Sequence, residues 1–355
     1  MTEVADMAGR GGEGSIRMPH AEPPAPGTAT EVAEGILWMR LPLPMALDHV
    51  NVYALDEGAD GWTIIDTGLD SHKTRAIWEA ILSGPLGGRP VTRVIVTHHH
   101  PDHIGLAGWF QGRGATLHTT RTAWLFTRML VLDVQDRPNA ETIAFWKSAG
   151  MDRAILAARE AERPFNFAEC VHPLPLGYQR LTDGTAIRMG GRDWLVRCGD
   201  GHAPEHATFW ARDDSLVIGG DQLLPGISAN IGVYPTEPDA NPLDEWIASC
   251  AAFVPHARTS QLVLPGHKLP FTGLPTRLLQ MIDNHEAALD RLRNHLETPR
   301  TAAECFAPLF KRSIGAAEYG LALVEAVAHL NYLRHAGQAV RKRREDGAWL
   351  WRKVE

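Results

Sequence analysis

The sequence is poor in cysteine and has no surplus of basic residues. Its four cysteines are scattered over 355 residues without paired spacing, which argues against a disulfide framework or a zinc knuckle and fits a reducing compartment. A formal net charge of −7 argues against a nucleic-acid-binding protein, because such proteins usually carry a basic surplus.

Long apolar runs are also missing. None is long enough to cross a bilayer, and residues 1–14 contain neither the apolar stretch nor the basic region of a secretory signal. We therefore expect a cytoplasmic protein with no membrane partner. With 44% hydrophobic and 22% charged residues, the composition is that of a globular protein with one large domain and a smaller one.

Composition and periodicity divide the chain into three parts. Residues 1–30 are rich in Gly, Pro, Ala and Glu and are typical of a disordered tail. Residues 31–272 contain most of the strand patterns, together with an amphipathic, mostly helical stretch at about 120–165 that is too long for a connection and is predicted to be an insertion. Residues 273–355 show three helical patterns followed by two strand-like runs, which predict a winged-helix-like domain.

Local patterns place the elements more closely. The capping box of Thr301 and Glu304 begins one of the C-terminal helices, and Asp346-Gly347 predicts a hairpin with a type I′ turn. A helical pattern spans 77–82 and a short helix is expected at 104–110. Strands are predicted at 36–39, 50–55, 61–66, 91–96, 194–198, 207–211, 215–218 and 261–264.

Histidine is the residue type in excess, with 17 in the chain. Four of them lie between positions 98 and 103, directly after the strand at 91–96 and interrupted by Pro101 and Asp102, so the cluster is not a purification tag. The pattern His98-x-His100-x-Asp102-His103 after an apolar strand predicts a metal site. His98 and His100 flank His99, so these two can point one way while His99 points the other.

Three further candidate ligands follow predicted strands: His202, Asp221 and His267. Taken singly, each could be an ordinary loop or packed residue. In layered α/β folds, however, loops beyond the strand ends converge on one site, so together with the first cluster they predict a common site. Imidazole and carboxylate suit zinc, with iron or manganese as alternatives. Seven ligands exceed what one tetrahedral ion uses and suit two divalent ions roughly 3.5–4 Å apart that share a carboxylate.

Thr97-His98-His99-His100-Pro101-Asp102-His103 resembles the signature of the metallo-β-lactamase superfamily. Other motifs follow in the family's order over about residues 32–270: Asp66-Thr67-Gly68, Gly201-His202, Gly220-Asp221 and Gly266-His267. The resemblance implies an α/β fold, a four-layer αβ/βα sandwich. It also implies that His98, His100 and His202 hold one metal, that Asp102, His103 and His267 hold the other, that Asp221 bridges them, and that Asp66 orients a ligand imidazole.

Two segments resemble particular members of the superfamily. Residues 201–206, Gly-His-Ala-Pro-Glu-His, are similar to the Gly-His-Thr-Pro-Gly-His of glyoxalase II-like thioesterases, with Glu205 in place of a glycine. The C-terminal part resembles the winged-helix tail of some members, including an endoribonuclease. The insertion has no counterpart of this kind.

These features predict a hydrolase in which a metal-bound hydroxide cleaves a small-molecule thioester, ester or lactone. The catalytic carboxylates would be Asp102 and Asp221, which hold the hydroxide's orientation as ligands. The alternative is a two-metal phosphodiesterase or endoribonuclease, with Arg341–Arg344 as a phosphate contact. We interpret that run instead as a solvated strand, because acidic residues follow it and the chain is acidic. A non-catalytic binding protein is disfavoured by the complete ligand set.

The insertion is predicted to form a helical lid over the metal site. Its apolar residues would line a substrate pocket: Trp124, Phe126, Met129, Phe145 and Trp146. On sequence alone, an equal alternative is that they pack against the body of the protein or against a partner in a homodimer. The expected partner is a small-molecule substrate, and no nucleic acid is expected.

Overall fold

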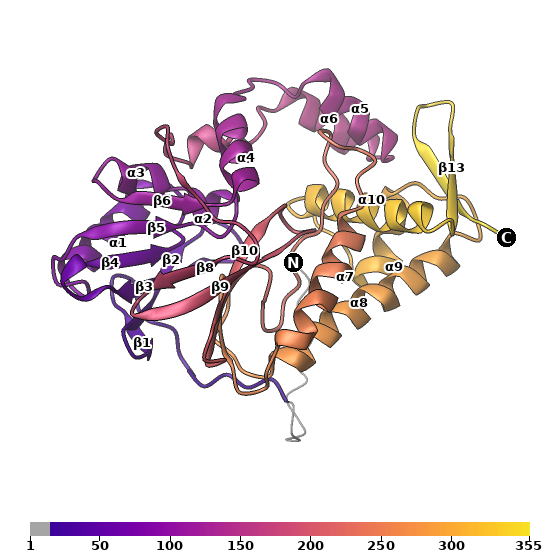
Figure 1. The fold of residues 1–355 in the computed structure, drawn as a ribbon. Helices are drawn as coiled ribbons and strands as arrows, with labels where there is room; N and C mark the ends of the chain where they lie inside the picture. The colour runs from indigo at the N-terminus through magenta and orange to yellow at the C-terminus, as the bar shows by residue number, and fades with distance from the viewer. Residues whose placement is uncertain (1–14) are drawn as a thin grey trace.

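The computed structural model of the chain describes residues 15–355, and two β-sheets form its centre (Figure 1). Within these residues the first sheet has seven strands in chain order: β1 (Thr30–Ala33), β2 (Ile36–Pro42), β3 (His49–Asp56), β4 (Trp62–Ile65), β5 (Val91–Ile95), β6 (Thr116–Thr119) and β7 (Gln179–Arg180). The second has five, in the order β12 (Leu262–Pro265), β11 (Leu216–Gly220), β10 (His206–Ala211), β9 (Arg192–Gly199) and β8 (Ala186–Met189). Neighbours from β4 to β7 are parallel, as are β11 and β12, and the other pairs are antiparallel.

The central strands β3, β4, β10 and β11 are buried on both faces, which is why they read as apolar runs. In β2, Trp38 belongs to the apolar cluster between the sheets, together with Phe209 of β10. The next residue, Met39, belongs to the cluster under the helices, together with Trp78 of α1 (His72–Ser83). This alternation is the period of two of a β-strand. With helices on the outer faces, the result is four layers, helix–sheet–sheet–helix, as the family resemblance implied.

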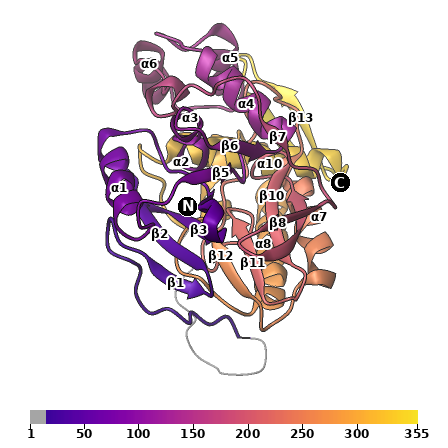
Figure 2. The same ribbon diagram turned by 60° about the vertical axis from the view of Figure 1, so that its left-hand side comes forward.

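Helices cover the outer faces of the two sheets. Figure 2 shows α1 outside the first sheet and, on the far side of the second, α7 (Pro242–Phe253) and α8 (Leu274–His295). The remaining short elements lie in connections: α2 (Pro101–Ile104), α3 (Ala107–Gln111), η1 (Gly58–Asp60), η2 (Phe167–Glu169) and η3 (Val254–His256).

The insertion forms an arch between the first sheet and the C-terminal helices (Figure 1). It consists of α4 (Arg121–Leu132), α5 (Ala140–Ser148) and α6 (Arg153–Ala161). Its far end is held by the C-terminal part, because the Ala303 N–H donates to the Ala149 carbonyl at 3.1 Å and the Asp152 N–H donates to the Tyr319 hydroxyl at 3.1 Å. The far end of the insertion is therefore packed against the C-terminal part.

The C-terminal part begins with the long helix α8, the first of the three helices that the sequence predicted. After it come η4 (Ala303–Cys305), α9 (Phe306–Phe310), α10 (Tyr319–His335) and a hairpin of β13 (Ala339–Arg343) and β14 (Trp349–Lys353). Only half of the predicted capping box is present: the Glu304 carboxylate accepts from the Thr301 N–H at 2.7 Å, but the Glu304 N–H donates to the Thr301 carbonyl at 3.2 Å and not to the Thr301 hydroxyl. The type I′ turn is wrong, because it needs positive φ at both central residues and within residues 344–348 only Gly347 has it, at 91°.

Two further expectations are corrected. The helix predicted at 104–110 is broken into α2 and α3, because the Leu106 N–H donates to the Thr67 hydroxyl at 3.0 Å instead of continuing the helix. Residues 1–14 of the predicted tail lie outside the described residues. From Ser15 on, a disordered tail is wrong, since Arg17 and Thr272 exchange two backbone hydrogen bonds.

Within residues 15–355 no helix is both long and apolar enough to cross a membrane.

Candidate metal centre

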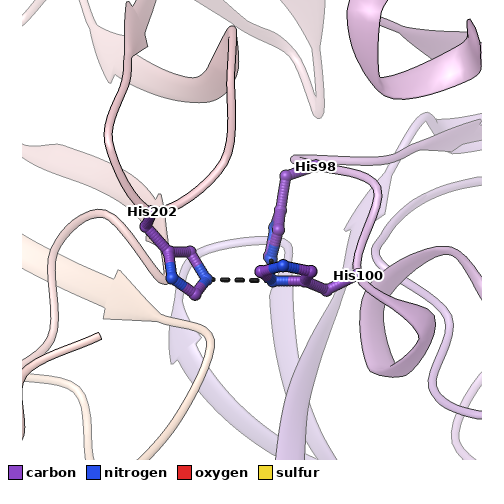
Figure 3. Close-up of side chains that lie close together, drawn as sticks. All are labelled: His98, His100 and His202. Carbon is purple, nitrogen blue, oxygen red and sulfur yellow. Dashed lines mark hydrogen bonds between the residues drawn. The ribbon is translucent and has the colours of Figure 1, made fainter. Parts of the chain in front are cut away.

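Three histidine side chains from two loops meet at one point (Figure 3). His98 and His100 follow β5, and His202 lies in the loop between β9 and β10. The Nε2 atom of His98 lies 2.9 Å from Nδ1 of His100, which lies 3.0 Å from Nε2 of His202. The structure thus brings together side chains that are about a hundred residues apart in the sequence.

The hydrogen bonds of these rings leave lone pairs at the meeting point. The Nδ1–H of His202 donates to the Asn230 carbonyl at 2.9 Å. The Nδ1 atom of His98 lies 3.0 Å from the Thr97 hydroxyl, which itself donates to Asp66 and so accepts from the ring. Nε2 of His98 and Nε2 of His202 therefore both carry a lone pair. A single proton on Nδ1 of His100 can be donated to only one of them. A cation shared by the three nitrogens fits this arrangement.

A second group lies beside the first. Asp102 and His103 come from α2, and His267 follows β12. Oδ2 of Asp102 lies 3.6 Å from Nε2 of His103 and 3.5 Å from Nε2 of His267. The Nδ1–H of His267 donates to the His49 carbonyl at 2.8 Å, which again leaves its Nε2 free to face the site.

Asp221, at the end of β11, connects the two groups. Its Oδ2 lies 3.5 Å from Nε2 of His202 and 3.2 Å from Nε2 of His267, and its Oδ1 lies 3.4 Å from Nε2 of His103. Within residues 15–355, Oδ1 of Asp221 and Nε2 of His103 are buried without a hydrogen-bond partner. Unpaired buried polar atoms are costly, and a metal ligated by both atoms would relieve that cost.

Asp66 joins the loop of the first histidines to the second group. One of its carboxylate oxygens accepts from the Thr97 N–H at 2.8 Å, and the other accepts from the Thr97 hydroxyl at 2.9 Å and from Nδ1–H of His103 at 2.8 Å. The backbone of Asp66 has φ 58°, a conformation that non-glycine residues adopt at a cost. The carboxylate thus fixes the ring of His103, as the sequence comparison with the family implied.

Glycines in two of the motifs are required by space. A Cβ on Gly266 would lie 2.3 Å from Oδ1 of Asp221, and one on Gly220 would lie 2.5 Å from the ring of His206. No side chain tolerates such contacts, so these glycines let the chain pass directly beneath the candidate ligands.

Burial and charge set the protonation of the histidines. Burial lowers the pKa of His98 and His100 well below the usual range, so both rings are neutral at pH 7, the form that binds metals. Burial also acts to lower the pKa of His103, but the nearby carboxylates, Asp221 foremost, raise it well above its usual value. This side of the site therefore stabilises positive charge. The Asp102 side chain is 18% exposed and that of His103 0%, so solvent reaches the centre from the side of Asp102.

The structure adds positioning residues that the sequence did not identify. The buried ring of His206 stacks on His98 with centroids 4.4 Å apart, and its Nε2 accepts from the Asp221 N–H at 3.1 Å. The motif at 201–206 contained His206, but its spacing alone gave it no role. Asn230 lies in a loop without any periodic pattern, so nothing in the sequence indicated that its carbonyl would hold His202.

The insertion touches the candidate centre through α4. The ring of Phe126 lies 5.1 Å from that of His99. Glu205, beside His206, accepts hydrogen bonds from the backbone N–H of Thr122, at 2.9 Å, and from its hydroxyl. The beginning of α4 is thereby fixed to the loop that carries His202.

The five apolar residues predicted to line a pocket lie in different surroundings. Trp124 stacks on Tyr178 with centroids 5.0 Å apart, and Met129 is 44% exposed. Phe145 is buried in the core under the helices, and Trp146 packs against that core. Of the five residues, only Phe126 and Met129 therefore lie at or near the exposed face of α4. The other three pack within the arch or against the core.

Comparisons with known proteins agree with this fold. Residues 45–284 match the sequence model of the Metallo-beta-lactamase superfamily, and residues 289–354 match the Metallo-beta-lactamase-like, C-terminal domain. The two matches meet inside α8, whereas the sequence predicted a boundary between residues 272 and 273, just before that helix.

Related proteins resemble the chain over most of its length. The probable metallo-hydrolase YqjP of Bacillus subtilis (strain 168) is 27% identical over 310 residues, which are 84% of this chain and 92% of the relative. A solved beta-lactamase domain protein from Burkholderia ambifaria is 36% identical with a TM-score of 0.87, covering 96% of this chain and 98% of that one. A solved metallo-beta-lactamase family protein from Thermus thermophilus is 28% identical with a TM-score of 0.75, covering 91% and 100%.

Proposed function

The chain belongs to the metallo-beta-lactamase superfamily, and we propose that it is a dinuclear metal-dependent hydrolase that cleaves a thioester, ester or lactone of a small molecule. The observation that carries the proposal is the meeting of three imidazole nitrogens at 2.9 and 3.0 Å, with Asp221 reaching from that point to a second group of ligands.

The proposed ligands form two groups that share one carboxylate: His98, His100 and His202; Asp102, His103 and His267; and Asp221 between them. Zinc suits such a mixture of imidazole and carboxylate, with iron and manganese as alternatives. Divalent ions in sites of this kind polarise a carbonyl and lower the pKa of water toward about 7.

The chain itself contributes orientation. Hydrogen bonds from Nδ1 of His103, His202 and His267 fix these rings with Nε2 toward the centre. Asp102 and Asp221 are the proposed catalytic carboxylates. Asp102 is reachable from solvent, so it is placed to accept a hydrogen bond from the attacking water and to hold its approach toward a carbonyl carbon.

An acyl substrate is supported by the surroundings of the centre. Phe126 lies against His99, and Met129, one turn further along α4, is 44% exposed. Apolar side chains beside a polar centre suit an acyl chain better than a polyanion. The thioester comes first because residues 201–206 are similar to the glyoxalase II-like motif. The same proposal includes that the insertion forms a lid over the centre and does not form the contact of a homodimer.

A phosphodiesterase or endoribonuclease is the weaker proposal. The basic run that would bind phosphates is engaged within the protein: Arg341 pairs with Asp239 at 2.8 Å and Arg344 with Asp346 at 2.8 Å. The side chain of Arg343 lies over Trp349, 4.5 Å from the ring centroid. The winged-helix-like character of the C-terminal part, the absence of a nucleic-acid partner and a cytoplasmic location stay predictions.

The test is elemental analysis of the purified protein followed by a panel of thioester, lactone and bis-aryl phosphodiester substrates. We expect two metals per chain and hydrolysis of thioesters or lactones. His100→Ala and Asp221→Ala should abolish activity while circular dichroism shows a preserved fold. Full activity with one metal or none would contradict the dinuclear centre. Cleavage of phosphodiesters alone would favour the alternative.

A further inference from the structure

The loop that orients His202 lies along the C-terminal helix α10. This loop connects β11 to α7 and contains Asn230, whose carbonyl accepts from Nδ1–H of His202. The side-chain amide of Asn230 donates to the Leu321 carbonyl at 3.2 Å and to the Glu325 carboxylate at 2.8 Å. Both acceptors belong to the first two turns of α10, so the amide is held at two points.

Further bonds continue along the same helix. The Val233 N–H donates to the Val324 carbonyl at 3.1 Å. Farther on, the Asn331 side chain donates to the Ala240 carbonyl at 2.8 Å, and Arg334 pairs with Asp239 at 2.7 Å. The loop is thus fixed to α10 at intervals from its middle to its end.

Asn230 is the point at which this contact reaches the candidate metal centre. A hydrogen bond to the second nitrogen of a ligand imidazole selects its tautomer and fixes the ring plane, and the loss of such a partner typically weakens metal binding or activity about 10–100-fold. Here the partner is a loop carbonyl, so its position depends on what holds the loop. Of the two acceptors that hold the Asn230 amide, Glu325 makes the shorter bond, 2.8 Å against 3.2 Å for the Leu321 carbonyl, and it is the one that a substitution can remove.

We propose that Glu325 of α10 is a positioning residue for the metal centre, acting through Asn230 on His202. On this proposal the C-terminal part helps to position a metal ligand. The inference rests on the proposed function for the identity of the ligands, but it concerns metal binding and is tested without substrate.

The test measures Zn²⁺ affinity by competition with a chromophoric chelator in two backgrounds. His267→Ala disables the group that contains Asp102 and His103, so Zn²⁺ binding in this background measures the group that contains His202. His100→Ala disables the group of His202 and reports on the other.

In the His267→Ala background, Glu325→Ala and Asn230→Ala should each weaken Zn²⁺ binding by about tenfold, the lower end of the range for losing the partner of a ligand imidazole, because both variants keep the Asn230 carbonyl. In the His100→Ala background neither should change it. Glu325→Gln retains an acceptor oxygen and should restore most of the affinity. Because both residues act through one contact, the double variant should be no weaker than either single variant.

A matched control is Glu286→Ala, which removes an exposed glutamate from α8 and should leave Zn²⁺ affinity unchanged. Circular dichroism checks folding, and Asn230→Ala decides the question if Glu325→Ala does not fold. Parental affinity in folded Glu325→Ala or Asn230→Ala, or additive losses in the double variant, would overturn the proposal. Zinc binding without hydrolysis by the wild-type chain would instead remove the proposed function and leave this inference standing.

Discussion

Glu205 offers a test in which the backbone conformation decides whether a glycine or an alanine at that position gives the more stable protein. Its φ is 50°, a left-handed conformation that costs a non-glycine residue about 1 kcal/mol or more. Its carboxylate accepts from the N–H and the hydroxyl of Thr122 in the first turn of α4 and lies 3.9 Å from Arg180. Burial raises the pKa of Glu205, but these bonds outweigh it and the pKa is lowered, so the side chain is ionised at pH 7.

The strained backbone and the carboxylate contacts together set the expected changes in the free energy of unfolding. Glu205→Ala keeps the strained backbone and removes a carboxylate at a helix N-terminus, which should cost about 1–2 kcal/mol. The ion pair with Arg180 adds little, because both side chains are more than a third exposed. Glu205→Gly loses the same contacts but relieves about 1 kcal/mol of strain. The glycine variant should therefore be more stable than the alanine variant by about 1 kcal/mol.

The assay is equilibrium urea unfolding of the metal-free protein, followed by circular dichroism and compared at constant m-value. The matched control is Glu286 in the middle of α8, where helix propensity should make glycine less stable than alanine by about 1 kcal/mol. If alanine were also the more stable residue at position 205, the left-handed conformation and the argument built on it would be refuted.

Asp66→Asn should weaken Zn²⁺ binding about 10–100-fold at the group that contains His103, whose ring Asp66 holds at 2.8 Å; unchanged affinity in a chelator competition would count against this. The buried His285 and His329, between α8 and α10, should make the protein less stable in acid, because burial lowers their pKa to about 3 and about 4. The unfolded chain protonates near its ordinary value of about 6.5, so the free energy of unfolding should fall as the pH drops below that value, by about 2 kcal/mol per histidine between pH 8 and pH 5. Urea unfolding of a double leucine variant at both pH values should show a smaller loss than the wild type, and an equal loss would exclude the pair as its source. Phe126→Ala should raise KM for an acyl thioester with kcat nearly unchanged, and a selective loss of kcat would argue against a role in substrate binding.

The sequence predicted β4 and β11, which lead into the candidate centre, well because these strands are buried on both faces. An apolar run such as 91–96 that ends in polar ligands is a local signal, and it corresponds to β5 (Val91–Ile95) followed by the loop of His98 and His100. The seven side chains named from the sequence lie together in the structure because their loops leave the same edge of the sandwich.

Elements without a local signal were missed. Strand β7 has two residues, both exposed, too few for any period to show. The break between α2 and α3 depends on the Thr67 hydroxyl, which takes the N–H of Leu106 from 39 residues away. Asn230 and Glu325 are 95 residues apart, and in a single sequence neither residue differs from an ordinary loop asparagine or helix glutamate. Contacts of this kind are set by tertiary packing and not by periodicity.

Strained backbone conformations near the candidate centre could not be predicted from the sequence either. Their positions help to explain how the site is built. Three non-glycine residues with positive φ border the ligand motifs: Asp66 at 58°, Glu205 at 50° and Lys268 at 68°. Polar contacts from other elements hold each of them. Lys268, for example, accepts from Arg40 at 2.7 Å through its carbonyl and donates to His49 at 2.9 Å through its N–H. Turn rules would assign glycine to such positions, but at 66 and 205 a glycine would lose the carboxylate that holds His103's ring or the start of α4. The chain therefore tolerates strain at these two positions because their side chains position the groups around the candidate metal centre.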